Sequence, residues 1–105
     1  MAEDNPVPVL FRVEHLIRYG SPEVVAVFPT IPSNNRGGMT CYAHVGQHSS
    51  CSGAWLVDTR PARPEEYADL KAELEAPPYR YVLKVYQRHT KAHREALAAV
   101  LRKYA

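Results

Sequence analysis

The sequence predicts an α+β domain, with a small, mainly antiparallel sheet of four or five strands and two helices packed on one face. Three patterns indicate this fold. Residues 24–28 (VVAVF) are apolar on both alternating sides, residues 39–45 alternate in polarity, and residues 64–75 have helical periodicity. A chain of 105 residues fits a single domain. It is also long enough to bury a core without metals or disulfides.

Short apolar runs between turn residues mark the first strands. Residues 1–8, which contain two prolines, are expected to form a loose N-terminal arm before a strand at 9–13. The strand at 24–28 is expected to end at Pro29, which has no backbone donor. Residues 30–38 (TIPSNNRGG) are then expected to form a long loop, because Pro, Asn and Gly favour turns.

The middle of the chain gives two further strands. One is expected over residues 39–45 and closes at Gly46. Residues 47–53 (QHSSCSG) are typical of a polar turn, and residues 54–58 (AWLVD) are expected to form another short strand.

A helix is expected over residues 64–75, because Pro64 suits the first helical position and two glutamates follow it. Its buried stripe is Tyr67, Leu70 and Leu74. A half-buried strand at 79–88 comes next. Its inward side chains are expected to be Tyr81, Leu83 and Val85.

The last helix is expected over residues 90–105, with Thr90 as its N-cap. Its apolar face consists of His93, Leu97, Val100, Leu101 and Tyr104.

Charge is unevenly distributed along the chain. Residues 79–105 hold seven Lys or Arg and one acid, whereas residues 1–78 hold six basic and ten acidic side chains. Such asymmetry is one indication of an anionic partner, and the alternative explanation is a solvated surface with unevenly placed charge. The acidic start lacks the basic and apolar regions of a signal peptide, and no apolar run approaches the ~18 residues of a spanning helix. We therefore expect a cytoplasmic protein with no membrane partner and with reduced cysteines.

Two cysteines and two histidines lie close together in sequence. Cys41, His44, His48 and Cys51 form the pattern C-x2-H-x3-H-x2-C, and these side chain types bind zinc. In a strand, however, Cys41 and His44 would point to opposite faces and could not share a metal without a bulge. We therefore expect no metal and no cofactor, with a zinc-binding module as the alternative.

The same segment places His48 beside the nucleophiles Ser49, Ser50 and Cys51. A small hydrolase is thus an alternative, although neighbours in sequence rarely achieve the geometry of a catalytic triad. The chain has no G-x-S-x-G motif and no P-loop. We favour a non-catalytic role in which this polar loop binds a partner. The expected binding residues are Gln47, His48, Ser49 and Ser50.

A second candidate surface lies in the basic C-terminal third. Basic groups contact phosphates, and an exposed aromatic ring can stack on a base. The residues expected to face outward and bind nucleic acid are Arg80, Lys84, Tyr86, Arg88, Lys91 and Arg94. Lysine and arginine on a strand also discourage edge pairing, which is the alternative explanation for this pattern.

Four segments of the chain carry a family resemblance. They are Phe11-Arg12, VVAVFP at 24–29, YAHVGQHSS at 42–50 and TRPARPEEYADL at 59–70. The chain resembles an uncharacterised family of small proteins carried by phages, prophages and plasmids. The turn at 14–21 is longer than in that family, and Arg63 stands where the family has a helix-capping threonine. The cysteines and the basic helix after Thr90 lie outside the shared pattern.

The resemblance implies a mobile-element context but no established biochemistry. Together with the polar loop, it predicts a small non-catalytic binding or regulatory protein that acts on a host or phage protein, or on a nucleoprotein complex.

Overall fold

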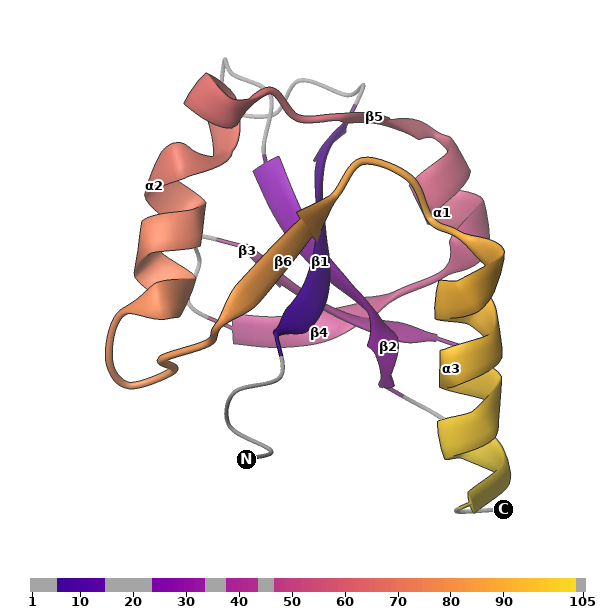
Figure 1. Ribbon diagram of the computed structural model, residues 1–105. Coiled ribbons are helices and arrows are strands. Elements are labelled where there is room, and N and C mark those ends of the chain that lie inside the picture. The colour runs from indigo at the N-terminus through magenta and orange to yellow at the C-terminus, as the bar shows by residue number, and fades with distance from the viewer. Residues whose placement is uncertain (1–5, 15–23, 34–37, 44–46, 104–105) are drawn as a thin grey trace.

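Strand β1 lies at the centre of a six-stranded sheet (Figure 1). The computed structural model describes residues 6–14, 24–33, 38–43 and 47–103, with residues 47 and 48 described in their backbone only. The elements are β1 (Val7–Glu14), β2 (Val24–Pro32), β3 (Met39–Ala43), β4 (Gln47–Cys51), α1 (Gly53–Val57), β5 (Thr59–Pro61), α2 (Pro64–Glu75), β6 (Leu83–Tyr86) and α3 (Lys91–Lys103). The α+β class and the mainly antiparallel sheet are therefore confirmed.

Both edges of β1 are paired. Strand β2 runs antiparallel along one edge, and β3 and β4 continue the sheet beyond it. On the other edge, β5 pairs antiparallel with Arg12–Glu14 and β6 pairs parallel with Val7–Leu10. Thus β5 and β6 share one edge of β1, end to end. The strand also begins at Val7, which places Val7 and Pro8 in the sheet rather than in the arm expected over residues 1–8.

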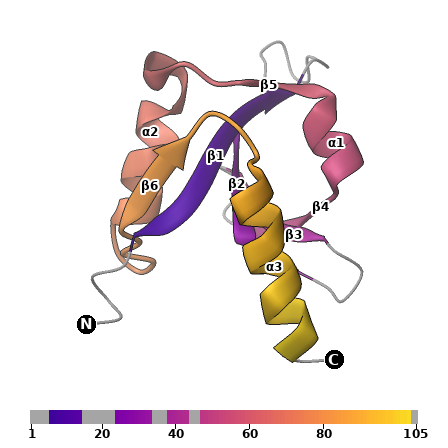
Figure 2. The same cartoon turned by 45° about the vertical axis from the view of Figure 1, so that its right-hand side comes forward.

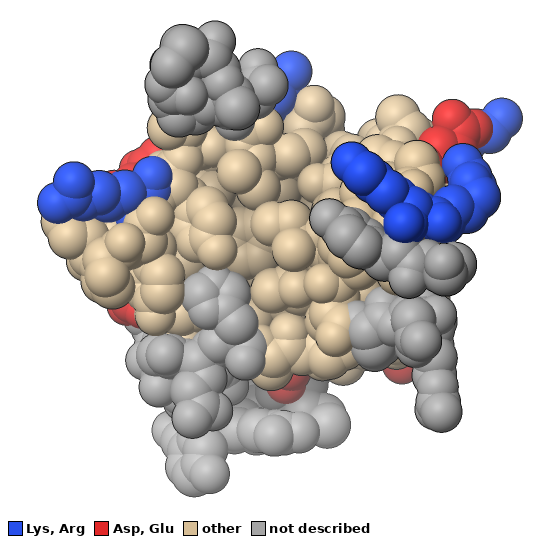
Figure 3. Space-filling model, turned by 90° about the horizontal axis from the view of Figure 1, so that it is seen from below, with Lys and Arg blue, Asp and Glu red and all other residues tan. Residues whose placement is uncertain are grey.

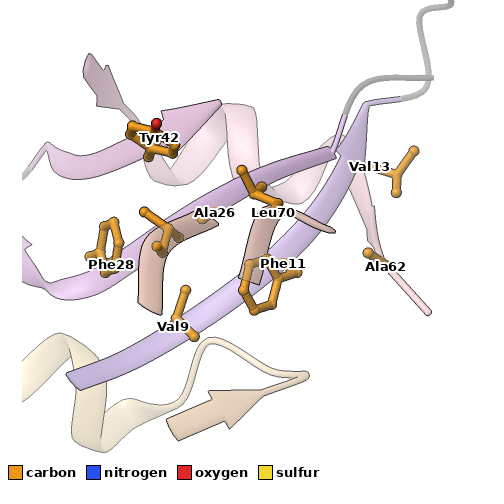
Figure 4. Packing of buried hydrophobic residues seen from close by; sticks show 9 residues of the cluster. Val9, Phe11, Val13, Ala26, Phe28, Tyr42, Ala62 and Leu70 are labelled. Atoms are coloured by element: carbon orange, nitrogen blue, oxygen red, sulfur yellow. The ribbon is translucent and has the colours of Figure 1, made fainter. Parts of the chain in front are cut away.

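Helices cover both faces of the sheet. Val9, Phe11 and Val13 of β1 face one way and pack with Leu70 of α2 and its neighbours (Figure 4). Leu10 faces the other way, into a cluster that includes residues of α1 and α3. Figure 2 shows α3 lying across this second face, where it packs on β2.

The expectation that both helices pack on one face is therefore wrong. Strands β1 and β2 are apolar on both faces, since Val25, Ala26, Val27 and Phe28 are all buried. A sheet of this kind needs cover on both sides.

Strand β2 continues past Pro29 to Pro32, against the expectation that Pro29 ends it. The register with β3 shifts between Phe28 and Pro32. A proline removes no ladder hydrogen bond at such an irregularity, so Pro29 is accommodated there in a buried position. Just after β2, the backbone N–H of Ser33 donates to the carbonyl of Gly38 at 3.0 Å.

The segment expected as a strand at 54–58 is the helix α1. Ser52 supplies the N-cap, because its Oγ accepts a hydrogen bond from the backbone N–H of Trp55 at 3.1 Å. Leu56 is the buried residue of this short helix. The three-residue strand β5 that follows was not expected from the sequence.

Helix α2 has the predicted limits. Leu70 and Leu74 are fully buried, and the Tyr67 ring stacks on Phe11 with 4.4 Å between the ring centroids. The hydroxyl of Tyr42 donates to the carboxylate of Glu73, which joins this helix to β3.

Glu66 closes the start of α2 in place of a capping threonine. Its Oε1 accepts a hydrogen bond from the backbone N–H of Arg63 at 2.8 Å. The guanidinium of Arg60 donates to both carboxylate oxygens, at 2.9 and 2.7 Å. An arginine side chain cannot accept a hydrogen bond, so the carboxylate of Glu66 is the acceptor at this helix end.

Strand β6 is shorter than the strand expected over residues 79–88. Its Leu83 and Val85 pack on the α2 side, as predicted, and Tyr81 packs there from the segment before the strand. Thr90 caps α3 as expected, because its Oγ1 accepts from the backbone N–H of His93 at 3.1 Å. No helix in the described part of the chain is both long enough and apolar enough to cross a membrane.

Leu74→Ala should lower the free energy of unfolding by about 2–5 kcal/mol, because it empties a fully buried site between α2 and the sheet. Urea unfolding followed by circular dichroism measures the change. Val57→Ala is the matched control, since Val57 is 81% exposed and its loss should cost no more than about 0.5 kcal/mol. Equal effects of the two changes would contradict the packing described here.

Glu66→Gln should remove part of the acid sensitivity of folding. The hydrogen bonds from Arg60 lower the pKa of Glu66 to about 2, below its unfolded value of about 4.3. This carboxylate therefore stabilises the fold above about pH 4.3, and that contribution is lost as the pH falls toward 2.

The variant should thus be less stable than the wild type at pH 7, with a difference that shrinks between about pH 5 and 2. Urea midpoints across this range test it. Glu65→Gln, on the same helix turn, controls for the loss of an exposed acid. A difference that stays constant with pH would rule out this role.

Candidate functional site

Strand β4 contains the four residues predicted to bind a partner. The expected polar turn at 47–53 is wrong, because Gln47–Cys51 pair antiparallel with all five residues of β3. Polar composition does not prevent this, since an edge strand faces solvent along one side and its pairing partner sets its conformation. His44 and Gly46 lie outside the described residues.

The strand register separates the four predicted binding residues into two pairs. Gln47 and Ser49 are paired with Ala43 and Cys41, whereas His48 and Ser50 are paired with Tyr42 and Thr40. Neighbouring positions of a strand alternate between the two faces of the sheet. The four residues therefore share one edge of the sheet rather than one face.

Among the strands that the structure describes, the outer edge of β4 has no pairing strand, and the same is true of β5 and β6 at the other end of the sheet. Within the described residues, β4 is the last strand in the order β4-β3-β2-β1-β5, with β3 as its neighbour. Ser49 and Ser50 are exposed, and the sequence QHSSC has neither proline nor lysine. Proteins commonly use those residues to protect an edge from pairing with another chain.

Two side-chain hydrogen bonds hold this edge strand in place. The hydroxyls of Ser33 and Ser50 lie 2.6 Å apart, which ties β4 to the end of β2. The Oγ of Ser49 lies 3.1 Å from the Sγ of Cys41 on β3. The edge strand is thus fixed by its side chains as well as by its backbone.

Cys41 and Cys51 form a pair of reduced thiols on the α3 side of the sheet. Both are buried, 6% and 8% exposed. A hydrogen bond between the two thiols lowers the pKa of Cys41 and raises that of Cys51. Both side chains therefore belong to the hydrophobic core.

The zinc pattern is not assembled in the described part of the structure. Position 48 is next to position 49, which pairs with Cys41, and it is three residues from Cys51 on the same strand, so the alternation of the strand places it on the other face from both cysteines. His44 is not described. Within the described residues, no group of three or more His, Cys, Asp or Glu side chains is placed to hold a metal ion.

Tyr86 is half-buried on the side of α3, whereas the sequence predicted that it faces outward for stacking. Helix α3 packs over this face, and the Tyr86 ring meets His93 edge-on with 4.5 Å between the ring centroids. The Nζ of Lys84 lies 5.5 Å from the centroid of the same ring. Tyr86 therefore stabilises the position of α3, and Lys84 is an exposed residue on β6.

The other predicted nucleic-acid residues lie in two places. Arg80 occupies the turn between α2 and β6, with a φ of 54° in the left-handed region. Arg88, Lys91 and Arg94 lie around the start of α3, where Lys91 pairs with Glu95 at 3.6 Å. Viewed from below, the Lys and Arg side chains gather at two sides of the molecule, with an uncharged surface between them (Figure 3).

Arg12 is the residue that sequence reasoning missed. Its Nε donates to Oγ1 of Thr59 at 2.8 Å and its Nη2 to the carbonyl of Thr59 at 2.6 Å. Its Nη1 donates to the carbonyl of Gln87 at 3.3 Å, just before α3. The signal was present in the sequence, because Arg12 interrupts an otherwise apolar run, VLFRV.

Tyr86→Ala should lower the free energy of unfolding by about 1–3 kcal/mol, because it removes the ring on which His93 packs. Lys84→Ala is the control on the same strand and should change stability by no more than about 0.5 kcal/mol. Chemical unfolding of both variants measures this. A Tyr86 variant as stable as the wild type would restore the prediction of an exposed stacking platform.

Neither protein-family models, nor curated proteins, nor solved structures gave a match to this chain.

Proposed function

We propose that this chain is a small non-catalytic binding protein that takes an extended segment of a partner protein along the edge of β4. The observation that supports this proposal is the open edge of a five-residue strand at the end of the sheet. In strand addition, backbone hydrogen bonds give affinity and alternating side chains give specificity. The residues predicted to bind, Gln47, His48, Ser49 and Ser50, all belong to this strand.

A preformed edge favours binding, because little conformational entropy is lost when the partner arrives. The pairing of β4 with β3 along its whole length orders the strand. The contacts of Ser33 with Ser50 and of Cys41 with Ser49 order its side chains. The partner segment then adds one more strand to an already formed sheet.

The strand arrangement supports binding over hydrolysis. A hydrolase in this segment would need His48 and a serine on the same side of the strand. Position 50 is on the same side as position 48 and position 49 is not, so Ser50 is the candidate nucleophile. The Ser50 hydroxyl lies 2.6 Å from that of Ser33, so this contact already uses the hydroxyl. Given the resemblance to proteins of phages and plasmids, the partner we propose is a host or phage protein.

Ser49→Lys should abolish binding of extended peptides, because a lysine on an edge strand opposes the addition of another strand. Peptides selected against the wild-type protein from a random library serve as probes, and fluorescence anisotropy measures their affinity. Ala99→Lys, an exposed site on α3, adds the same charge elsewhere and should leave the affinity unchanged.

Hydrogen exchange locates the bound peptide. The amides of Gln47–Cys51 should exchange more slowly in the complex than in the free protein. Protection confined to another surface, or equal loss of affinity in both lysine variants, would contradict strand addition at β4. Sedimentation of the free protein distinguishes pairing between two copies of this chain, which would also contradict the proposal.

A further inference from the structure

A pocket of about 390 Å³ opens beside the start of α3, among segments that are far apart in sequence. It is lined by side chains from β1, α1 and the connection from β6 into α3. They include Arg12, Val57, Arg88, His89 and Arg94. Its volume falls within the range of small-molecule sites, about 300–1,000 Å³.

Three guanidinium groups line this pocket. Within the described residues, the ion pairs involve Arg60, Arg63, Lys71 and Lys91, so none joins a carboxylate to Arg12, Arg88 or Arg94. The hydrogen bonds of Arg12 go to neutral oxygens, and Arg94 donates to the carbonyl of His89 at 3.1 Å. The positive charge of the pocket is therefore not balanced by these neighbours.

A buried polar atom lies beside this charge. The Nε2 of His89 has no hydrogen-bond partner within the described residues. Leaving a buried polar atom unsatisfied is unfavourable, and His89 is also one of the residues that line the pocket. Burial lowers the pKa of His89, so the ring is neutral at pH 7 and offers one donor and one acceptor.

The pocket also has an apolar wall. Val57 is 81% exposed, which is unusual for a large apolar side chain, and Leu56 and Pro61 lie in the same lining. A free inorganic anion would leave this wall in contact with water. A ligand with an anionic group and an apolar part would use both sides of the site.

We propose that this pocket binds a small phosphate monoester, with its phosphate on Arg88 and Arg94 and its apolar part against Val57. Guanidinium groups bind phosphate oxygens through paired, charge-assisted hydrogen bonds. The positive end of the α3 dipole lies at the same place and adds to the attraction. Arg12, held by Thr59 and Gln87, contributes fixed positive charge from β1.

Isothermal titration with adenosine monophosphate at about 50 mM salt tests the proposal. The expected result is saturable binding of one molecule per chain, weaker binding of inorganic phosphate and none of adenosine. Arg88→Gln and Arg94→Gln should each weaken binding by about tenfold or more, since each removes charge-assisted hydrogen bonds. Arg102→Gln removes the same charge from the last turn of α3 and should leave the affinity unchanged.

Amide chemical shifts give a second readout, which is the location of the bound ligand. Addition of adenosine monophosphate should shift the resonances of residues 87–94, and those of β4 should stay in place, which separates this site from the proposed strand addition. Equal weakening by Arg102→Gln would overturn the proposal, as would no saturable binding up to about 10 mM. Binding of a single-stranded oligonucleotide but not of the monophosphate would also overturn it, in favour of a nucleic-acid surface.

Discussion

The structure depends on the complete enclosure of β1. Both edges of this strand are hydrogen-bonded, by β2 on one side and by β5 and β6 on the other. Both of its faces are also buried, with Val9 and Phe11 under α2 and Leu10 on the side of α3. Every other layer is positioned relative to this strand, because the two helical layers lie on its two faces.

The parts of the fold that the sequence predicts well are those with strong local signals. Helix α2 begins and ends as predicted, because Pro64 suits a first turn and the Pro77-Pro78 pair cannot continue a helix. The apolar run in β2 is predicted equally well, because consecutive apolar side chains are stable only in a strand that is buried on both faces. Local chemistry decides these elements, so a reading of the sequence finds them.

Elements decided by distant contacts could not be predicted in this way. Strand β4 is polar and forms because β3 offers it an edge. Helix α1 was missed for a different reason, because its apolar pattern also suits a strand and the local cap by Ser52 decides for the helix. The face on which α3 packs is likewise set by the sheet as a whole. The pocket at α3 joins Arg12 to Arg94, and no local spacing reveals that pairing.

The end-to-end placement of β5 and β6 on one edge of β1 has a consequence for the order of folding during synthesis. Strands β1 to β4 leave the ribosome first and can pair with one another, because they are neighbours in the chain. The free edge and both apolar faces of β1 are covered only by the second half of the chain, from α1 onward. The nascent chain therefore exposes an apolar sheet until α2, β6 and α3 have been made, and an exposed sheet of this kind is prone to aggregation.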